Sequence, residues 1–231
     1  DQGFVFATFY PGEIVPDSPG LAQQYLKALS SISNTEVTGA ISAWAWGYSL
    51  ILDVLSENEK IDLDQVAIYG HSRNAKAALW AAANDERITM TIAHQSGTGG
   101  ATLNQSHVGE SIKSMTSQYP HWFDPNYRAV DGREEQLPVD QHHLIALIAP
   151  RPVLLGNAML DKWSDPKGAF RAMREASKIY DLYQAESFTA QDLKGFHPED
   201  RLSFWTRGAP HGVRSSDWEA FMEFLKSNIK Q

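Results

Sequence analysis

One stretch decides the fold: Val66-Ala67-Ile68-Tyr69-Gly70-His71-Ser72-Arg73-Asn74-Ala75-Lys76. Its first residues form a short β-branched and aromatic run that predicts a buried strand, and an alanine-rich helical pattern continues to Ala83. A strand that turns through Gly-x-Ser straight into a helix lifts the serine hydroxyl clear of the sheet. Ser72 is therefore a candidate nucleophile. A serine that only caps a crossover helix is the alternative interpretation of the same residues.

The rest of the chain repeats the alternation of strand and helix. We expect strands at residues 3–9, 66–69, 88–93, 153–156 and 202–205, and helices at 39–56, 73–83 and 141–148, one starting at Asp165-Pro166 and one at Ser216 with a capping box to Glu219. Strands that alternate with crossover helices predict a mostly parallel sheet covered on both faces. The expected fold is a three-layer αβα sandwich of the α/β-hydrolase type.

Composition limits the function classes. The 231 residues are 42% hydrophobic and 21% charged, which is typical of one globular domain, here expected over residues 1–231. A net charge of −8 argues against a nucleic-acid partner, and we find no apolar run of membrane-spanning length. Cysteine is absent, which excludes disulfides and thiolate metal sites. Because an apolar run begins at residue 3, we expect a domain that lacks earlier strands and a leader at its N-terminus.

A serine nucleophile needs a base, and the base needs an acid to orient it. In a sheet of this type the acid and the histidine follow later strands, in that chain order. Asp161 and Asp165 both follow the strand at 153–156, but Asp165 is explained as the cap of the next helix. Asp161 is therefore the candidate acid. His211 follows the last expected strand and is the candidate base.

Two other motifs suggest different chemistry and fit it poorly. Residues 96–100 (Ser-Gly-Thr-Gly-Gly) follow a strand but lack the Gly-Lys-Ser/Thr of a phosphate loop. His142 and His143 are adjacent on an expected helix, where side chains diverge by about 100°, so both cannot face one ion. We expect no cofactor and no metal. The long irregular region at 96–138 is of the kind that usually carries function.

The motifs taken together resemble the glucuronoyl esterases, carbohydrate esterase family 15. The resemblance covers Gly70–Lys76, Ser96–Ala101, Pro120–Phe123, Leu137–His142, Leu147–Pro152, Asp161–Pro166 and the His211 loop. It implies hydrolysis, without a metal, of the ester between 4-O-methylglucuronic acid of glucuronoxylan and lignin alcohols. It also implies an exported protein, secreted or periplasmic.

The same resemblance implies a role for each matched residue. Ser72 would be the nucleophile, His211 the base, and the Arg73 side chain a support for the oxyanion. Lys76, Glu110 and Trp163 would contact the sugar. Each of these three also has an ordinary explanation, as a solvated lysine, a solvated loop glutamate and a core tryptophan.

The sequence departs from the family pattern at several positions. Fungal members carry a catalytic glutamate directly before the Ser-Gly of the glycine-rich stretch, and here that residue is Gln95. Bacterial members can place the acid where Asp161 stands. Asn74 and Ala75 replace glycines of the elbow motif, and we expect Ala75 to be tolerated with some effect on the placement of the helix. The alternatives are another esterase, such as an acetyl-xylan esterase, or a carbohydrate-binding hydrolase homologue without activity.

Overall fold

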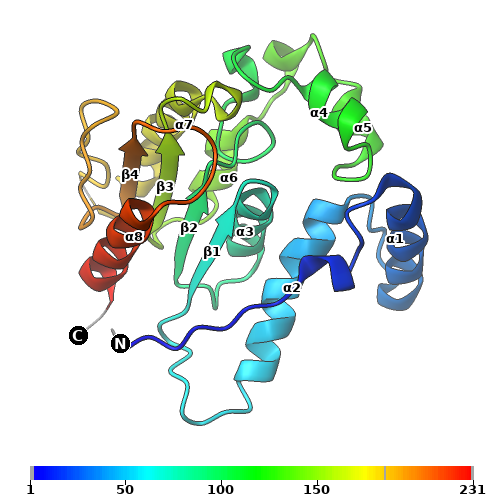
Figure 1. Cartoon of the computed structure of the whole chain (residues 1–231), viewed down its shortest axis with the longest axis horizontal. Helices are drawn as coiled ribbons and strands as arrows, with labels where there is room; N and C mark the ends of the chain where they lie inside the picture. Colours follow the sequence, from blue (N-terminus) through cyan, green and yellow to red (C-terminus); the bar gives the residue numbers. More distant parts are fainter. Residues whose placement is uncertain (1–2, 185, 230–231) are drawn as a thin grey trace.

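The computed structural model describes residues 3–184 and 186–229. Within these residues the chain forms a four-stranded sheet in which every neighbouring pair is parallel (Figure 1). The strands lie in chain order: β1 Ala67–His71, β2 Met90–His94, β3 Val153–Ala158 and β4 Leu202–Arg207. All four carboxyl ends therefore meet at one edge of the sheet, where α/β proteins place their sites. This confirms four of the five expected strands, with bounds that differ by two residues at most.

Helices cover both faces of the sheet, as the three-layer prediction requires. On one face, Phe221 and Phe224 of α8 pack on Ile92 and Leu154. On the other face, α3 packs on β1 and β2, α7 packs on β3 and β4, and α2 lies outside α3 (Figure 1). The helices are α2 Ala40–Leu55, α3 Arg73–Asn84, α6 Gln141–Ala146, α7 Pro166–Tyr180 and α8 Ser215–Asn228.

The strand expected at residues 3–9 is wrong. Residues 4–10 take no part in the sheet, and Val5 and Phe6 are 71% and 77% exposed. An apolar segment forms a strand only where it can pair with a neighbouring strand, and this segment pairs with no strand of the sheet. Phe9 instead packs edge-on against Tyr48 of α2, with ring centroids 5.1 Å apart.

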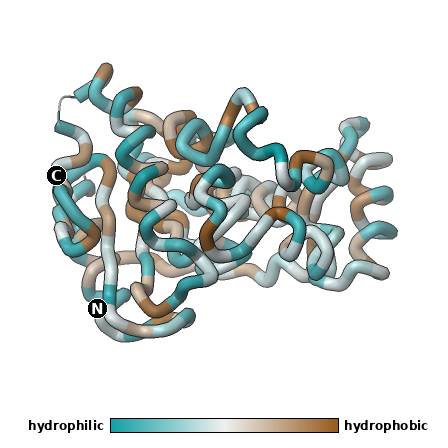
Figure 2. The backbone as a smooth tube through the Cα atoms, turned by 90° about the horizontal axis from the view of Figure 1, so that it is seen from above, coloured by the Kyte–Doolittle hydropathy of each residue, from teal (hydrophilic) through white to brown (hydrophobic). Residues whose placement is uncertain are grey.

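An amphipathic helix, α1 Pro19–Ser33, follows this segment and was not expected. It buries Ala22 and Leu26 on one side, and its outer side carries exposed residues such as Ile32. In Figure 2, hydrophilic and hydrophobic residues alternate along the helix at the edge of the molecule. A proline at the first helical position favours the start of α1 there.

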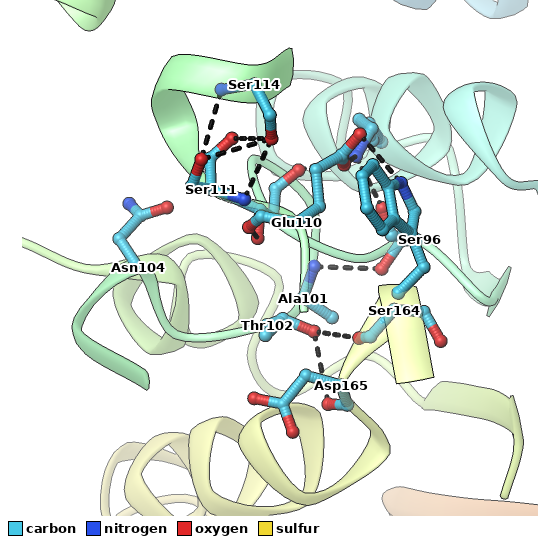
Figure 3. Close-up of polar contacts among 12 residues, drawn as sticks. Ser96, Ala101, Thr102, Asn104, Glu110, Ser111, Ser114, Ser164 and Asp165 are labelled. Carbon is cyan, nitrogen blue, oxygen red and sulfur yellow. Dashed lines mark hydrogen bonds and ion pairs between the residues drawn. The ribbon is translucent and has the colours of Figure 1, made fainter. Parts of the chain in front are cut away.

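The long region at 96–138 is largely irregular, as expected, but contains short elements. They are the 3₁₀ turns η2 Asn104–Ser106 and η3 Glu134–Gln136 and the helices α4 Ile112–Gln118 and α5 Pro125–Arg128. The start of α4 is a capping box between Ser111 and Ser114 (Figure 3). Two further 3₁₀ turns are η1 Pro11–Glu13 and η4 Lys162–Ser164.

The helix starts were predicted with mixed success. Asp165 caps α7 as expected, accepting a hydrogen bond from Gly168 N at 3.0 Å. The last helix begins at Ser215, and the side chain that reaches back to the cap is Asp217 rather than Glu219. The reason is that Asp217 is also held by Trp205 and Arg207 inside the protein, which fixes the register of the turn. In the described part of the chain, none of the helices has the length and hydropathy needed to cross a bilayer.

Candidate active site

Ser72 lies in a sharp turn between β1 and α3. Its φ of 57° and ψ of −125° fall in a region that non-glycine residues rarely adopt, and such strain gathers at functional sites. Gly70 makes the turn possible, because a Cβ there would lie 2.2 Å from the carbonyl oxygen of Asn74. Ala75, where the family motif has glycine, is fully buried in α3 without breaking the helix. This geometry is that of a nucleophile elbow.

Asp161 and His211 meet at the carboxyl edge of the sheet. His211 Nδ1 lies 2.7 Å from Asp161 Oδ2, and Asp161 is 4% exposed. Burial alone raises the pKa of Asp161, but hydrogen bonds from His211 and Ser164 outweigh it and hold the pKa below 3.8. The carboxylate therefore fixes the imidazole through Nδ1 and leaves Nε2 for a reacting group. The sequence prediction chose the carboxylate that contacts His211; Asp165 serves the helix cap.

The serine lies at the same rim as this pair but is not yet bonded to it. The ring of His71, which precedes Ser72, lies against the imidazole of His211, tilted by 42°, with ring centroids 4.7 Å apart. Within residues 3–184 and 186–229, the Ser72 hydroxyl makes no hydrogen bond with His211. Catalytic hydrogen bonds are often long in the free protein and tighten when substrate binds.

Gln95 braces the histidine loop. Its Oε1 accepts a hydrogen bond from Gly212 N at 2.9 Å and lies 2.9 Å from His71 Nε2. Gln95 is buried, with a φ of 55°, directly after β2. Gln95 thus links His71, which precedes Ser72, to Gly212, which follows His211, through hydrogen bonds of an uncharged amide. The carboxylate that contacts His211 is Asp161, whereas the Gln95 amide carries no charge.

A second brace was missed in the sequence. Arg207, at the end of β4, pairs through Nε with both carboxylate oxygens of Asp217, at 2.8 and 2.7 Å. Its terminal nitrogens donate to the carbonyl oxygens of Pro210, at 3.3 Å, and Gly212. The guanidinium therefore holds the backbone on both sides of His211. An arginine followed by Gly-Ala-Pro-His-Gly is the signal that could have pointed to it.

The Arg73 side chain is held from outside the elbow. It forms an ion pair with Asp17, and its guanidinium carbon lies 4.7 Å from the Trp122 ring centroid and 5.2 Å from that of Tyr119. Asp17 also accepts hydrogen bonds from His121 Nε2 at 2.9 Å and Trp122 Nε1 at 2.8 Å. Burial raises the pKa of Asp17, but these hydrogen bonds and the positive charge of Arg73 lower it by a larger amount, so the net shift is downward. The sequence offered no sign of Asp17.

Lys76, Glu110 and Trp163 form one cluster beside the elbow. Lys76 is 4% exposed; its Nζ donates to the carbonyl oxygens of Ser96 and Thr98 and lies 3.5 Å from Glu110 Oε2. Glu110 is also buried and accepts a hydrogen bond from Trp163 Nε1 at 3.1 Å. Neither Lys76 nor Glu110 is a solvated surface residue. The Trp163 ring is half exposed, so it is not a core residue.

Desolvation lowers the pKa of Lys76 to about 8, although the neighbouring Glu110 opposes the shift. A buried ammonium with a perturbed pKa in a cluster of polar groups is a common feature of functional sites. The glycine-rich loop that supplies its carbonyl partners is held in turn, since Thr102 Oγ1 donates to Ser164 O at 2.7 Å and Ser96 Oγ accepts from Ala101 N at 2.9 Å (Figure 3).

Comparisons with known proteins agree with this geometry. Residues 26–183 match the family model described as "Glucuronyl esterase, fungi". Carbohydrate esterase MZ0003, from an unknown prokaryotic organism, is 38% identical over 99% of this chain and 54% of its own length. A 4-O-methyl-glucuronoyl methylesterase of Podospora anserina is 28% identical over 96% of this chain and 47% of its own length.

A solved structure of a promiscuous CE15 esterase from a marine bacterial metagenome superposes with a TM-score of 0.84 and 35% identity, over 95% of this chain and 57% of that one. The chain thus spans about half the length of the curated relatives that it matches. The family model covers more than half of the chain, in the residues that form the elbow, the glycine-rich loop and the acid loop. The chain belongs to the glucuronoyl esterase family.

Proposed function

We propose that this chain is a serine carboxylesterase that hydrolyses esters of glucuronic acid or 4-O-methylglucuronic acid, as found between glucuronoxylan and lignin. Relatives named 4-O-methyl-glucuronoyl methylesterase support the substrate class. The observation that carries the proposal is the 2.7 Å contact of His211 with Asp161 at the strand edge where the strained Ser72 also lies.

In the first half of the reaction, Ser72 Oγ attacks the uronoyl carbonyl carbon while His211 Nε2 takes the hydroxyl proton. The tetrahedral intermediate collapses as His211 returns that proton to the leaving alcohol. A water molecule then attacks the acyl-enzyme, again through His211, and releases the uronic acid and free Ser72. Asp161 keeps the imidazole in one tautomer and stabilises the imidazolium that forms twice in each turnover.

Arg73 supplies the oxyanion support in this proposal. Its backbone N–H is in the first turn of α3, where amides lack helical partners and the helix dipole favours negative charge. Its side chain adds a positive charge anchored by Asp17. One donor of this kind contributes roughly 3–4 kcal/mol to transition-state stabilisation.

Lys76, Glu110 and Trp163 would recognise the uronic acid. The Glu110 carboxylate suits sugar hydroxyls, the buried Lys76 ammonium 3.5 Å from it adds its positive charge, and the half-exposed Trp163 offers an apolar face for a pyranose ring. A simple acetyl esterase needs none of the three. This cluster therefore favours a uronate ester over an acetyl-xylan substrate.

The test compares benzyl glucuronate with an acetylated xylan for wild type and Ser72→Ala. We expect turnover of the uronate ester alone, loss of at least a thousandfold in Ser72→Ala, and labelling of wild-type Ser72 by a fluorophosphonate. Faster turnover of the acetyl ester would favour the acetyl-xylan esterase alternative. A chain that neither turns over nor labels would favour a sugar-binding homologue without activity.

The polymer substrate also bears on location and on the unit that acts. Because glucuronoxylan cannot enter a cell, we propose that the protein works after export, in the periplasm or outside the cell. We further propose that residues 1–231 belong to one catalytic domain. Detection of the protein in a cell-free or periplasmic fraction would test the first point.

A further inference from the structure

A polar cavity of about 550 Å³ opens among residues 98–112 and 131–135, and Ser72, Asp161 and His211 are not part of its lining. Four carboxylates line it: Glu110, Asp131, Glu134 and Glu135. Its described lining residues include no lysine or arginine. Walls of one charge concentrate the field, so this cavity favours a cation.

Three side chains in the cavity converge. His107, Glu134 and Glu135 each offer one ligand atom, and these atoms all lie within 4.8 Å of one another. His107 follows η2, and the two glutamates begin η3, so the cluster joins two segments that are distant in the sequence. His107 and Glu135 are exposed and can adjust, whereas Glu134 is fixed by burial.

Glu134 supplies the independent observation. It is 5% exposed, and its Oε2 is buried without a hydrogen-bond partner in the described part of the chain. Buried acids of the candidate active site, by contrast, are compensated: Asp161 by His211, and Asp217 by Arg207. A buried carboxylate oxygen that lacks a partner is costly unless a cation neutralises it.

We propose that His107, Glu134 and Glu135 bind one divalent transition-metal ion, with Zn²⁺ the best match. An imidazole nitrogen with carboxylate oxygens suits zinc and its neighbours, whereas Ca²⁺ and Mg²⁺ prefer oxygen ligands throughout. Zinc bonds of about 2.0–2.2 Å require ligand atoms that lie closer together than 4.8 Å, and the exposed His107 and Glu135 can move to meet this. The cavity leaves room for water in the remaining position.

The ion would act as a structural link rather than in the chemistry. It would tie η3 to the segment 107–110, and Glu110 at the end of that segment contacts Lys76 and Trp163. The ester-cleaving groups lie elsewhere, so hydrolysis needs no metal in this arrangement. Zinc binding and the proposed esterase activity can therefore fail independently.

The test is calorimetric titration of ZnCl₂ into the chelator-treated, desalted chain. We expect one site with a micromolar or lower Kd, weakened at least tenfold in His107→Ala, Glu134→Gln and Glu135→Gln. The matched control is Glu199→Gln, since Glu199 lies 3.8 Å from His197 in an exposed pair outside the lining of this cavity. CaCl₂ and MgCl₂ should bind at least tenfold more weakly than ZnCl₂.

Thermal unfolding supplies a second readout. Zinc at about a hundred times its Kd should raise the wild-type Tm by roughly 5–10 °C. Glu134→Gln should raise the Tm of the zinc-free protein, because it removes a buried uncompensated charge, and should abolish the response to zinc. The exposed His107→Ala should fold normally and also lose the response. Absence of a zinc site, binding unchanged in these variants, or tighter binding of Ca²⁺ would overturn the proposal.

Discussion

Arg207 and Asp217 form a buried ion pair directly beneath the loop that carries His211. Arg207 Nε contacts both oxygens of Asp217, and the rest of the guanidinium holds the carbonyl oxygens of Pro210 and Gly212. The strand β4 and the helix α8 are thereby joined through the residues that flank the proposed base. The position of the imidazole depends on this pair as well as on Asp161.

Arg207→Lys should lower kcat for the uronate ester about tenfold and leave KM little changed. A lysine keeps a charge for Asp217, so the fold should persist, but one ammonium cannot also reach both carbonyl oxygens. Steady-state kinetics with a thermal unfolding curve would check this. The matched control is Arg201→Lys just before β4, where the side chain contacts the exposed Gln184 and kcat should not change. An Arg207→Lys variant with wild-type kcat would show that the loop is held by other contacts.

Asp161→Asn should lower kcat by about 10⁴-fold, because the amide favours the wrong imidazole tautomer. Asp165→Asn should keep kcat and Tm near wild type, since asparagine caps helices as well as aspartate and tolerates the φ of 44° found there. Stopped assays with the benzyl ester measure kcat for both variants, and a thermal unfolding curve measures the Tm of Asp165→Asn. If only Asp165→Asn loses activity, the acid has been assigned to the wrong carboxylate.

The sheet and the elbow could be predicted because their signals are local. The strand, Gly-x-Ser and helix occupy consecutive residues, 66–76, and β3 and β4 are followed closely by Asp161 and His211. The chain order of nucleophile, acid and base then selects Asp161 and His211. Contacts of this type are set by topology, which the alternation of strands and helices already fixes.

The supporting contacts could not be predicted, because they join residues that no local pattern relates. Asp17 reaches Arg73 across 56 positions, and nothing in the loop around Pro16 marks it as a partner. Residues 3–9 show the opposite failure. Their apolar pattern predicts a buried strand, but burial depends on a neighbouring strand, which the local pattern cannot reveal.

Asp17→Asn should lower kcat about tenfold with little effect on KM. The introduced amide can still accept from His121 and Trp122 through Oδ1, but its nitrogen cannot accept from Arg73, so the change removes one contact selectively. Asp62→Asn, in an exposed turn, is the control. Kinetics with the benzyl ester checks the effect. A rise in kcat would mean that Asp17 holds the guanidinium away from the oxyanion rather than in place for it.

Lys76 should give the enzyme an alkaline limit in KM near pH 8. Burial lowers its pKa to about 8, so at higher pH the ammonium becomes neutral, and Glu110 and the sugar hydroxyls no longer feel its positive charge. Between pH 8 and its ordinary pKa of 10.5, the unfolded chain binds this proton and the folded chain does not, so this group adds stability as pH rises. An increase in KM therefore cannot be assigned to unfolding caused by Lys76. Lys76→Met should have a high KM that stays flat from pH 7 to about 9.5, measured beside wild type in the same buffers. An equal alkaline rise in the variant would place the titrating group elsewhere.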